Sequence, residues 1–203
     1  MKKKRKKLII LIVLASIILL SIVGALLLFL PQNKEEFPEP ILPDLYFYTP
    51  DYEIDILSDP EYLELNRDIS YKRGAVTTTV SPESYASTDV VLAFIAEYVN
   101  TMINGDYNAY PLFFTDEYKA KNDLPEKFTM QRIYNITVEM ISEERNDEGE
   151  NQYIYMLDYY ICKNDGTLRR DMDSDSSRPQ YLVITGSTDN FKIDNIITYF
   201  NQN

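Results

Sequence analysis

The sequence predicts an α+β fold with an N-terminal transmembrane helix, and two patterns indicate the fold class. Apolar residues recur at helical spacing from about residue 89 to 122, and they alternate with polar residues from about 134 to 200. Helices that precede a run of strands are typical of the α+β class. We expect three helices packed in a curved antiparallel sheet of about four or more strands.

Residues 8–30 are uncharged and mostly apolar. In a helix that rises about 1.5 Å per residue, this run is roughly 34 Å long and can cross a hydrocarbon core of about 30 Å. A cleavable signal peptide is the alternative, but its apolar region is only about 7–15 residues long and ends in a small-residue cleavage site that is missing here. We therefore expect a retained, single-pass signal-anchor helix over 8–30.

The cations in front of this run predict its orientation. They are Lys2, Lys3, Lys4, Arg5, Lys6 and Lys7. Because Lys and Arg beside a membrane span favour the cytoplasmic side, residues 1–7 become a basic cytoplasmic stub. The C-terminal part is then extracytoplasmic and held at the cell membrane. This topology and the lack of disulfides indicate a surface protein of a Gram-positive-type bacterium.

Charge and composition exclude several classes of function. Six of the 20 basic residues precede residue 31, so residues 31–203 hold 14 basic and all 32 acidic residues, a net charge of −18. Such a surface repels a phosphate backbone, and we expect no nucleic-acid partner. The single cysteine, Cys162, excludes an internal disulfide and a cysteine-rich zinc site. The chain has no histidine, which excludes Ser-His-Asp and Cys-His catalysis, and we expect no cofactor.

Residues 31–66 hold six prolines among many acidic residues and tyrosines, without a sustained period. Proline and like charges keep a linker extended, so we expect an acidic tether over 31–66. The folded domain is expected over 67–203, with its core at 85–203. The aromatic residues of the tether either dock on the domain, which we favour, or form a short recognition element. They are Tyr46, Phe47, Tyr48 and Tyr52.

The predicted domain begins with a hairpin and a long helix. Residues 69–80 place β-favouring runs on either side of Gly74, which predicts a hairpin turn. The clearest helix covers about 89–104, where apolar residues recur at helical spacing. We expect Thr88 to cap its N-terminus and Gly105 to end it.

Two short helical pieces and four strands should complete the domain. The helical pieces cover 107–114 and run from a Thr115 cap to about 122. A strand with one solvated face is indicated by alternating apolar residues, namely Tyr134, Ile136, Val138 and Met140. Residues 153–162 are apolar on both faces, so we expect a central strand there. The other strands are expected at 181–185 and 191–200, with turns at 147–149 and 186–190.

The passage from Asn104-Gly105-Asp106-Tyr107 to Leu112-Phe113-Phe114-Thr115 resembles a "helix, Gly-Asp, aromatic, Leu-Phe-Thr" stretch of the NTF2-like superfamily, the cystatin-like α+β cone. The resemblance covers roughly residues 85–203 and implies a curved sheet wrapped around a long helix. An anchor followed by such a domain is similar in layout to the VirB8-like and TcpC-like assembly components of conjugative secretion systems. That similarity concerns layout alone.

Asp158 lies in the middle of the otherwise apolar strand over 153–162, near Tyr155 and Tyr160 in the sequence. A carboxylate in such surroundings is the best candidate for a raised pKa and an acid–base role. These three residues are therefore our candidate pocket. The alternative, which we favour, is that Asp158 pairs with a Lys or Arg or faces solvent.

The polar stretch after this strand is a candidate surface for a partner. Its charged residues are Arg169, Arg170, Asp171, Asp173, Asp175 and Arg178. The three aspartates have the spacing of a calcium loop, but Ser176 and Leu182 replace the turn glycine and the bidentate glutamate of an EF-hand. We reject an EF-hand and predict no metal site, with a weak calcium contact as the alternative. The simplest expectation is a loop that neutralises its own charge.

These patterns predict a non-enzymatic, membrane-anchored extracytoplasmic domain for interaction or assembly. Its partners are the membrane and other proteins or a second copy of the chain. The alternatives are a small-ligand-binding domain and an enzyme that uses Asp158 with a tyrosine. A polar pocket larger than about 300 Å³ favours these alternatives, whereas a filled interior with an exposed apolar patch favours assembly.

Overall fold

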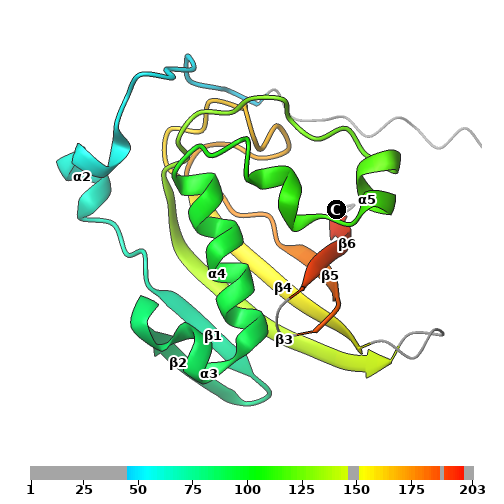
Figure 1. Ribbon diagram of the computed structural model, residues 1–203. Coiled ribbons are helices and arrows are strands. Elements are labelled where there is room, and N and C mark those ends of the chain that lie inside the picture. The colour runs from blue at the N-terminus through cyan, green and yellow to red at the C-terminus, as the bar shows by residue number, and fades with distance from the viewer. Residues whose placement is uncertain (1–44, 146–150, 188–189, 199–203) are drawn as a thin grey trace, which may run out of the picture. The chain divides into compact units, whose positions relative to one another are not determined.

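A computed structural model describes residues 45–145, 151–187 and 190–198 of the chain. In these ranges a curved sheet lies against one long helix, α4 (Val90–Ile103) (Figure 1). The sheet has six strands in the order β2-β1-β3-β4-β5-β6. Their bounds are β1 (Ile69–Arg73), β2 (Val76–Val80), β3 (Ile133–Arg145), β4 (Asn151–Ile161), β5 (Gln180–Thr185) and β6 (Lys192–Thr198).

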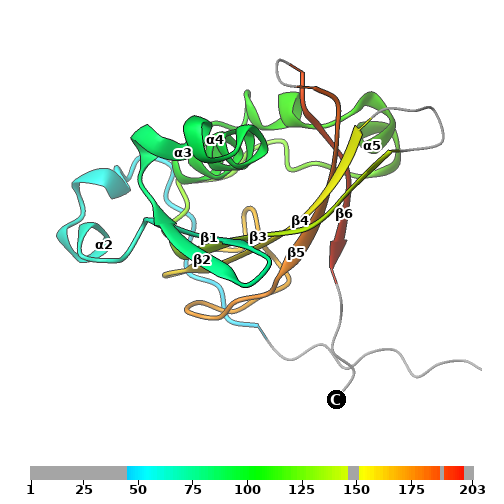
Figure 2. The same ribbon diagram turned by 90° about the horizontal axis from the view of Figure 1, so that it is seen from below.

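The remaining helices are short. The α-helices are α2 (Pro60–Leu63), α3 (Tyr85–Thr88) and α5 (Asp116–Lys121), and the 3-10 turns are η1 (Ile56–Ser58), η2 (Pro82–Ser84) and η3 (Tyr110–Phe113). Helices α3, α4 and α5 lie on the same side of the sheet (Figure 2). The core therefore forms between α4 and the concave face of the sheet.

The class is α+β, but the predicted arrangement of three helices in a purely antiparallel sheet is wrong. The part of the chain that the structure describes has four α-helices, and its sheet is mixed because β1 pairs with β3 in parallel. The hairpin predicted over 69–80 exists, but it joins the main sheet through β1. The chain passes from β2 through α3 and α4 before it returns as β3. This crossover brings β3 beside β1 in the same direction.

No helix within 45–145, 151–187 and 190–198 is long and apolar enough to cross a membrane. The predicted span at 8–30 and its flanking cations Lys2, Lys3, Lys4, Arg5, Lys6 and Lys7 lie outside these ranges. The transmembrane, signal-anchor and cell-membrane predictions are corrected on this finding, because they depend on the hydropathy and flanking cations of residues 8–30 and no described helix supports them. The predicted extracytoplasmic location depends on the same inference and is corrected with it, whereas the predicted stub at 1–7 lies outside the described residues.

The N-cap residue of helix α4 lies one position later than predicted. The side chain of Asp89, not Thr88, accepts hydrogen bonds from the backbone N–H groups of Val91 and Leu92, at 2.8 and 3.2 Å. An aspartate at this position satisfies N–H groups that have no partner within the helix. Gly105 ends the helix as predicted, with a φ of +63°. A Cβ there would lie 2.8 Å from the backbone nitrogen of Met130.

Large aromatic side chains fill the space between α4 and the sheet. Tyr98 and Tyr110 stack with ring centroids 5.6 Å apart, and their hydroxyl groups lie 3.1 Å from each other. Phe114 packs edge-on against both rings, and Phe128 packs edge-on against Tyr110. All four side chains are buried. Because the chain has no tryptophan, its large aromatic core side chains are tyrosine and phenylalanine.

Strand β3 departs from the predicted alternation at its start. Asn135 has a φ of +50°, and the pairing with β4 shifts between Tyr134 and Thr137. This β-bulge places Ile133 and Ile136 in the core together, although three residues separate them. The alternation predicted Tyr134 and Ile136 on the same face of the strand, but the bulge places them on opposite faces. Tyr134 contacts the ring of Tyr160 on the other face, at 5.5 Å between centroids.

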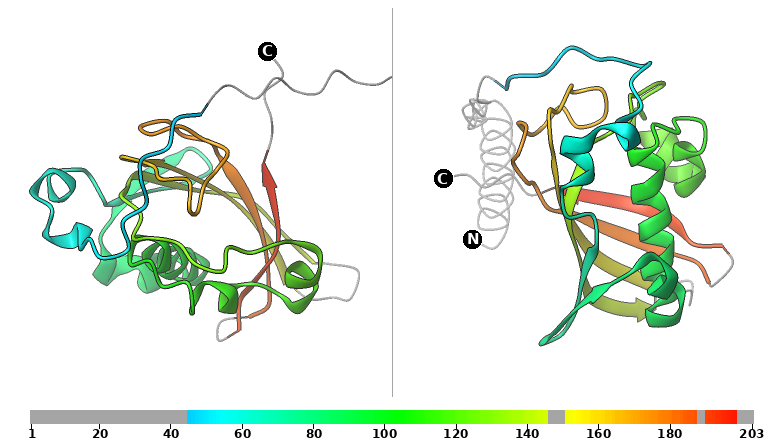
Figure 3. Two further views of the ribbon diagram at one scale, coloured as in Figure 1. Left: turned by 90° about the horizontal axis from the view of Figure 1, so that it is seen from above. Right: turned by 90° about the vertical axis from the view of Figure 1, so that its left-hand side faces the viewer.

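The described part of the predicted tether, residues 45–66, packs on the domain. Ile56 and Tyr62 are buried in the core, and the Tyr62 hydroxyl group donates a hydrogen bond to the carbonyl oxygen of Ile133. Residues 45–50 run along the loop between β4 and β5 (Figure 3), where the backbone N–H of Tyr48 donates to the carbonyl oxygen of Asn164. The domain thus includes residues before 67, and buried apolar side chains are the reason.

Candidate functional site

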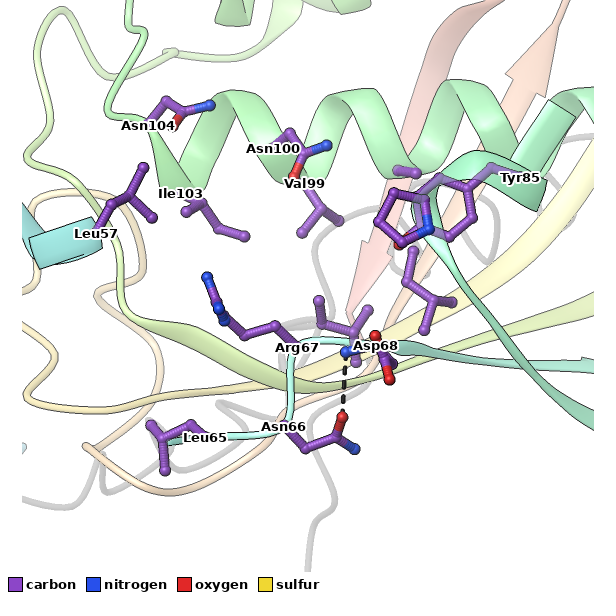
Figure 4. A pocket seen from close by; sticks show the side chains of 14 residues that line it. Leu57, Leu65, Asn66, Arg67, Asp68, Tyr85, Val99, Asn100, Ile103 and Asn104 are labelled. Atoms are coloured by element: carbon purple, nitrogen blue, oxygen red, sulfur yellow. Dashed lines mark hydrogen bonds between the residues drawn. The ribbon is translucent and has the colours of Figure 1, made fainter. Parts of the chain in front are cut away.

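A groove of about 460 Å³ lies between α4, the segment that leads into β1, and the region of η2 and α3 (Figure 4). Its volume falls within the range of about 300–1,000 Å³ that is typical of ligand sites. A pocket larger than about 300 Å³ favours a ligand-binding domain over a filled interior, and this groove is larger.

Apolar side chains form the floor of the groove. Val99 and Ile103 come from α4, Ile69 comes from β1 and Ile136 comes from β3. All four are buried, with between 1 and 7% of each residue exposed. Ile69 and Ile136 are direct neighbours in the parallel β1–β3 pairing. The correction to the sheet therefore bears directly on the site, because the parallel pairing creates half of this floor.

A guanidinium group marks one end of the groove. Arg67 extends toward the end bounded by Leu57 and Ile103 (Figure 4). Its guanidinium carbon lies 5.4 Å from the centre of the Tyr62 ring, and no carboxylate within the described ranges forms a salt bridge with it. An arginine without a carboxylate partner is notable in a chain with 32 acidic and 20 basic residues. This end is suited to an anion.

Two carboxamides and a second charged end complete the rim. Asn100 lines the groove from the last turns of α4 and Asn104 from the C-cap of the helix, and both residues are exposed. Asp68 lies toward Tyr85 at the other end (Figure 4). Burial, together with the charges of Asp68 and Glu83, raises the pKa of Tyr85. The rim can thus bind a carboxylate at one end while its amides hydrogen-bond to polar groups between the ends.

The structure separates the three residues of the predicted pocket. Successive residues of a strand point to opposite faces, so Tyr155 faces α4 while Asp158 and Tyr160 face the other side of the sheet. The Tyr155 hydroxyl group donates to Asp89 at 2.9 Å, and the Tyr160 ring packs against Tyr134. Asp158 and Tyr155 therefore cannot share a substrate in the concave face.

Asp158 has a raised pKa, mainly because it is buried, although a hydrogen bond from Ser177 partly offsets this. The Ser177 hydroxyl group lies 3.3 Å from Oδ2, and Oδ1 is buried without a hydrogen-bond partner among the described residues. Asp158 forms no salt bridge within those ranges, which differs from the ion pair that we had considered. It does not line the groove.

Asp89 is the carboxylate that Tyr155 contacts. Its Oδ1 accepts the two N–H groups at the start of α4, and its Oδ2 accepts the hydroxyl groups of Tyr71 and Tyr155 at 2.6 and 2.9 Å. Arg73 lies 4.0 Å from Oδ2. Burial and the contact with Asp89 raise the pKa of Tyr71 to about 12. Both oxygens of Asp89 are occupied, so this cluster joins α4 to β1 and β4.

The charged loop between β4 and β5 largely neutralises itself. Arg169 is buried and forms a two-pronged ion pair with Asp171, at 2.7 and 2.9 Å. It also donates to the Tyr159 hydroxyl group at 2.9 Å and to the carbonyl oxygen of Arg178. Burial raises the pKa of Asp171, but the hydrogen bonds and charge of Arg169 outweigh it and hold the pKa below its usual value. Arg178 lies 3.6 Å from the same carboxylate.

The other residues of the predicted partner loop have separate contacts. Asp173 accepts a hydrogen bond from the backbone N–H of Tyr46, and Asp175 accepts one from the Tyr134 hydroxyl group at 3.0 Å. Arg170 is exposed. The part of the chain in the structure contains no group of three or more acidic or cysteine side chains placed to hold a metal ion. The three aspartates of the loop thus bind three different partners and do not converge on one point.

In comparisons with known proteins, the chain matches no protein-family model, no curated protein and no solved structure.

Sequence analysis missed the groove residues. Asn66 is the last residue of the predicted tether and Arg67 is the first residue of the predicted domain, while Asn100 and Asn104 lie on the polar face of a predicted helix. The available signal was the spacing of four between the two asparagines, which places them on one face of a helix. Nothing local indicates that the segment before β1 would lie opposite that face.

Proposed function

We propose that this domain is a non-enzymatic binding domain that takes up an apolar group with a neighbouring carboxylate, presented by an extended segment of a partner protein. The guanidinium group of Arg67 would bind the carboxylate, and the apolar floor would bury the attached side chain. Asn100 and Asn104 would hydrogen-bond to the backbone of the segment. The NTF2-like resemblance is compatible with this proposal, but the proposal does not depend on it.

One observation carries the proposal: an arginine without a carboxylate partner in the described structure stands at the end of an apolar-floored groove in an acidic protein. Arginine presents donors in a planar fork that matches a carboxylate. The strong negative charge of the chain would repel an anionic partner elsewhere on its surface, so recognition of a carboxylate needs a local cation. The exposed rim residues leave room for a longer chain to continue out of the groove.

Binding is favoured over catalysis because the best-placed acid–base groups are occupied. Asp89, the carboxylate nearest to buried tyrosines, accepts four hydrogen bonds. Asp158 lies on the other face of the sheet from Tyr155, and neither lines the groove. The groove residues themselves, two carboxamides and a guanidinium group among them, are suited to recognition more than to proton transfer near neutral pH.

A matched pair of small probes tests the proposal. N-acetyl-leucine has an apolar side chain beside a carboxylate, and N-acetyl-leucinamide is the same molecule with the charge removed. Saturation-transfer NMR with the full chain should detect the acid with a dissociation constant on the order of a few millimolar, as expected for so small a ligand. Arg67→Gln should weaken its binding about tenfold, which corresponds to one lost charge-assisted contact, and should leave the amide unaffected.

Arg145→Gln is the control, because it removes the same charge from an exposed position at the end of β3. It should not change the binding of either probe. Displayed peptides selected on the full chain and counter-selected on Arg67→Gln should be enriched in an acidic residue next to Leu, Ile or Val. Equal binding of acid and amide, or equal binding by the wild type and Arg67→Gln, would contradict the proposal.

A further inference from the structure

The two edges of the sheet differ in whether another segment forms backbone hydrogen bonds with them. At the β6 edge, the backbone N–H of Thr115 donates to the carbonyl oxygen of Ile193 at 3.0 Å, and Phe114 forms a bridge with the same residue. At the β2 edge, no backbone hydrogen bond from another element of the described structure reaches the outer side of the strand. In Figure 2 β2 is the outermost strand. Open edges are sites where another strand can add.

Strand β2 also lacks the features that protect an edge. Its sequence is Val-Thr-Thr-Thr-Val, without a charge, proline or glycine. All five side chains are β-branched and favour a strand. The first four residues are exposed, and Val76 retains 64% of its accessible surface. Natural sheets usually protect such an edge with a lysine, a proline or a bulge, so this strand is suited to accept a further strand.

The hairpin geometry identifies the free backbone groups. Gly74, with a φ of +59°, occupies the first of two turn positions between the paired residues Arg73 and Val76. The residues that flank a two-residue turn exchange hydrogen bonds, and the pattern then alternates along the strand. Val76, Thr78 and Val80 are therefore bonded to β1. The N–H and C=O groups of Thr77 and Thr79 point away from the sheet.

We propose that β2 pairs in antiparallel fashion with β2 of a second copy of this chain, about a twofold axis through Thr78. The order Val-Thr-Thr-Thr-Val reads the same in both directions, so this register places valine opposite valine and threonine opposite threonine. Thr77 then faces Thr79 of the second copy, and the free groups of both residues form hydrogen bonds. Cross-strand threonine pairs are favourable, and a twofold interface requires such self-complementarity.

Charge does not oppose this pairing, because β2 carries no charged residue and no like charges face each other across the twofold axis. Arg73 pairs with Val76 on β1, one strand in from the open edge, and its guanidinium group lies 4.0 Å from Asp89, so it belongs to the Asp89 cluster.

A five-residue strand pair is smaller than a standard interface, which buries at least about 1,200 Å². We therefore expect a weak dimer, with a dissociation constant on the order of 0.1 mM. The interface does not use the groove, and the two proposals stand independently. A strand of a different protein is the other occupant of this edge, and the experiment below discriminates against it.

Disulfide trapping in the full chain tests the register. In a background in which Cys162 is replaced by Ser, Thr78→Cys places two cysteines across the axis in a pair without backbone hydrogen bonds, with Cα atoms about 4.5 Å apart, which a disulfide can bridge. Val76→Cys is the matched control, because its two copies would lie four residues out of register. With diamide as oxidant, Thr78→Cys should form the covalent dimer at least about tenfold faster than Val76→Cys.

Two further variants separate strand pairing from other association of the chain. Added to Thr78→Cys, the pair Thr77→Lys and Thr79→Lys places like charges opposite each other and should slow trapping. The pair Thr77→Lys and Thr79→Glu places opposite charges across the axis and should restore it. Equal trapping of Thr78→Cys and Val76→Cys would overturn the proposal, as would equal trapping of the two charge variants.

Discussion

Replacing Asp89 with alanine tests how the long helix is attached to the sheet. The carboxylate caps α4 through two backbone N–H groups and accepts the hydroxyl groups of Tyr71 on β1 and Tyr155 on β4. Only 9% of its side chain is exposed. In the variant, the cap is lost and the Tyr155 hydroxyl group, on a residue that is 1% exposed, loses its acceptor. The effect should therefore exceed that of an ordinary helix cap.

The contributions can be added. Loss of an N-cap lowers the free energy of unfolding by about 1 kcal/mol. Each hydrogen bond between a tyrosine and the carboxylate stabilises the fold by about 1.5 kcal/mol at the low end of the range for charged groups. We expect Asp89→Ala to lose about 3–5 kcal/mol, a large part of the about 5–15 kcal/mol of a typical domain. Asp89→Ser retains the cap without the two tyrosine contacts and should lose about 1 kcal/mol less.

Urea unfolding followed by far-UV circular dichroism and tyrosine fluorescence is a suitable measurement, since the chain has 17 tyrosines and no tryptophan. Asp116→Ala is the control, because Asp116 lies in the first turn of α5 but is fully exposed; its midpoint should not change. Combining Asp89→Ala with Tyr155→Phe should show a coupling energy of at least about 1 kcal/mol. A loss no larger than that of a cap, or the absence of coupling, would refute the proposed link.

Two other measurements test the packing. The pKa values of Tyr62 and Tyr71 are raised to about 12, mainly by burial. Because these tyrosines ionise near pH 10 in the unfolded state, their contribution to stability should be constant below pH 10 and fall between pH 10 and 12, by up to about 1.4 kcal/mol per pH unit for each tyrosine. A flat profile between pH 10 and 12 would contradict this. Gly105→Ala should lower the free energy of unfolding by at least about 1 kcal/mol more than Gly74→Ala. Both glycines have a positive φ, but only at Gly105 would a Cβ meet backbone atoms. Equal unfolding midpoints of the two variants would contradict this clash.

Local patterns predicted most of the individual elements. Helix α4, the Thr115 cap of α5 and the strand at 153–162 follow from periodicity and capping residues, and β4 does lie in the middle of the sheet. Only the face of Tyr155, Leu157, Tyr159 and Ile161 is buried, and the residues of the other face of β4 are half-buried. The turn predicted at 147–149 lies outside the described residues.

The errors arose where distant parts of the chain meet. The bulge at Asn135 depends on pairing with β4 and reverses the face of Tyr134, which no alternation in β3 can reveal. Docking was expected for the aromatic residues of the tether, but the burial of Ile56 and Tyr62 was not, because a proline-rich, acidic segment has the composition of a linker. Asp158 was predicted to share a pocket with Tyr155, although their spacing of three already places them on opposite faces of a strand.

The two proposed binding features have a common origin in the segment that precedes α4. The resemblance that we noted in the sequence covers residues 85–203, yet Leu57, Leu65 and Arg67 form one wall of the groove, and β2 forms the open edge of the sheet. The parallel pairing of β1 with β3 joins them, because it sets Ile69 beside Ile136 in the groove floor and leaves β2 outermost. A helix and sheet without this addition would lack the cation of Arg67, and β3 would take the place of β2 as the outer strand. If the domain acts by binding, its specificity therefore resides in residues 56–80 more than in the part that resembles a known superfamily.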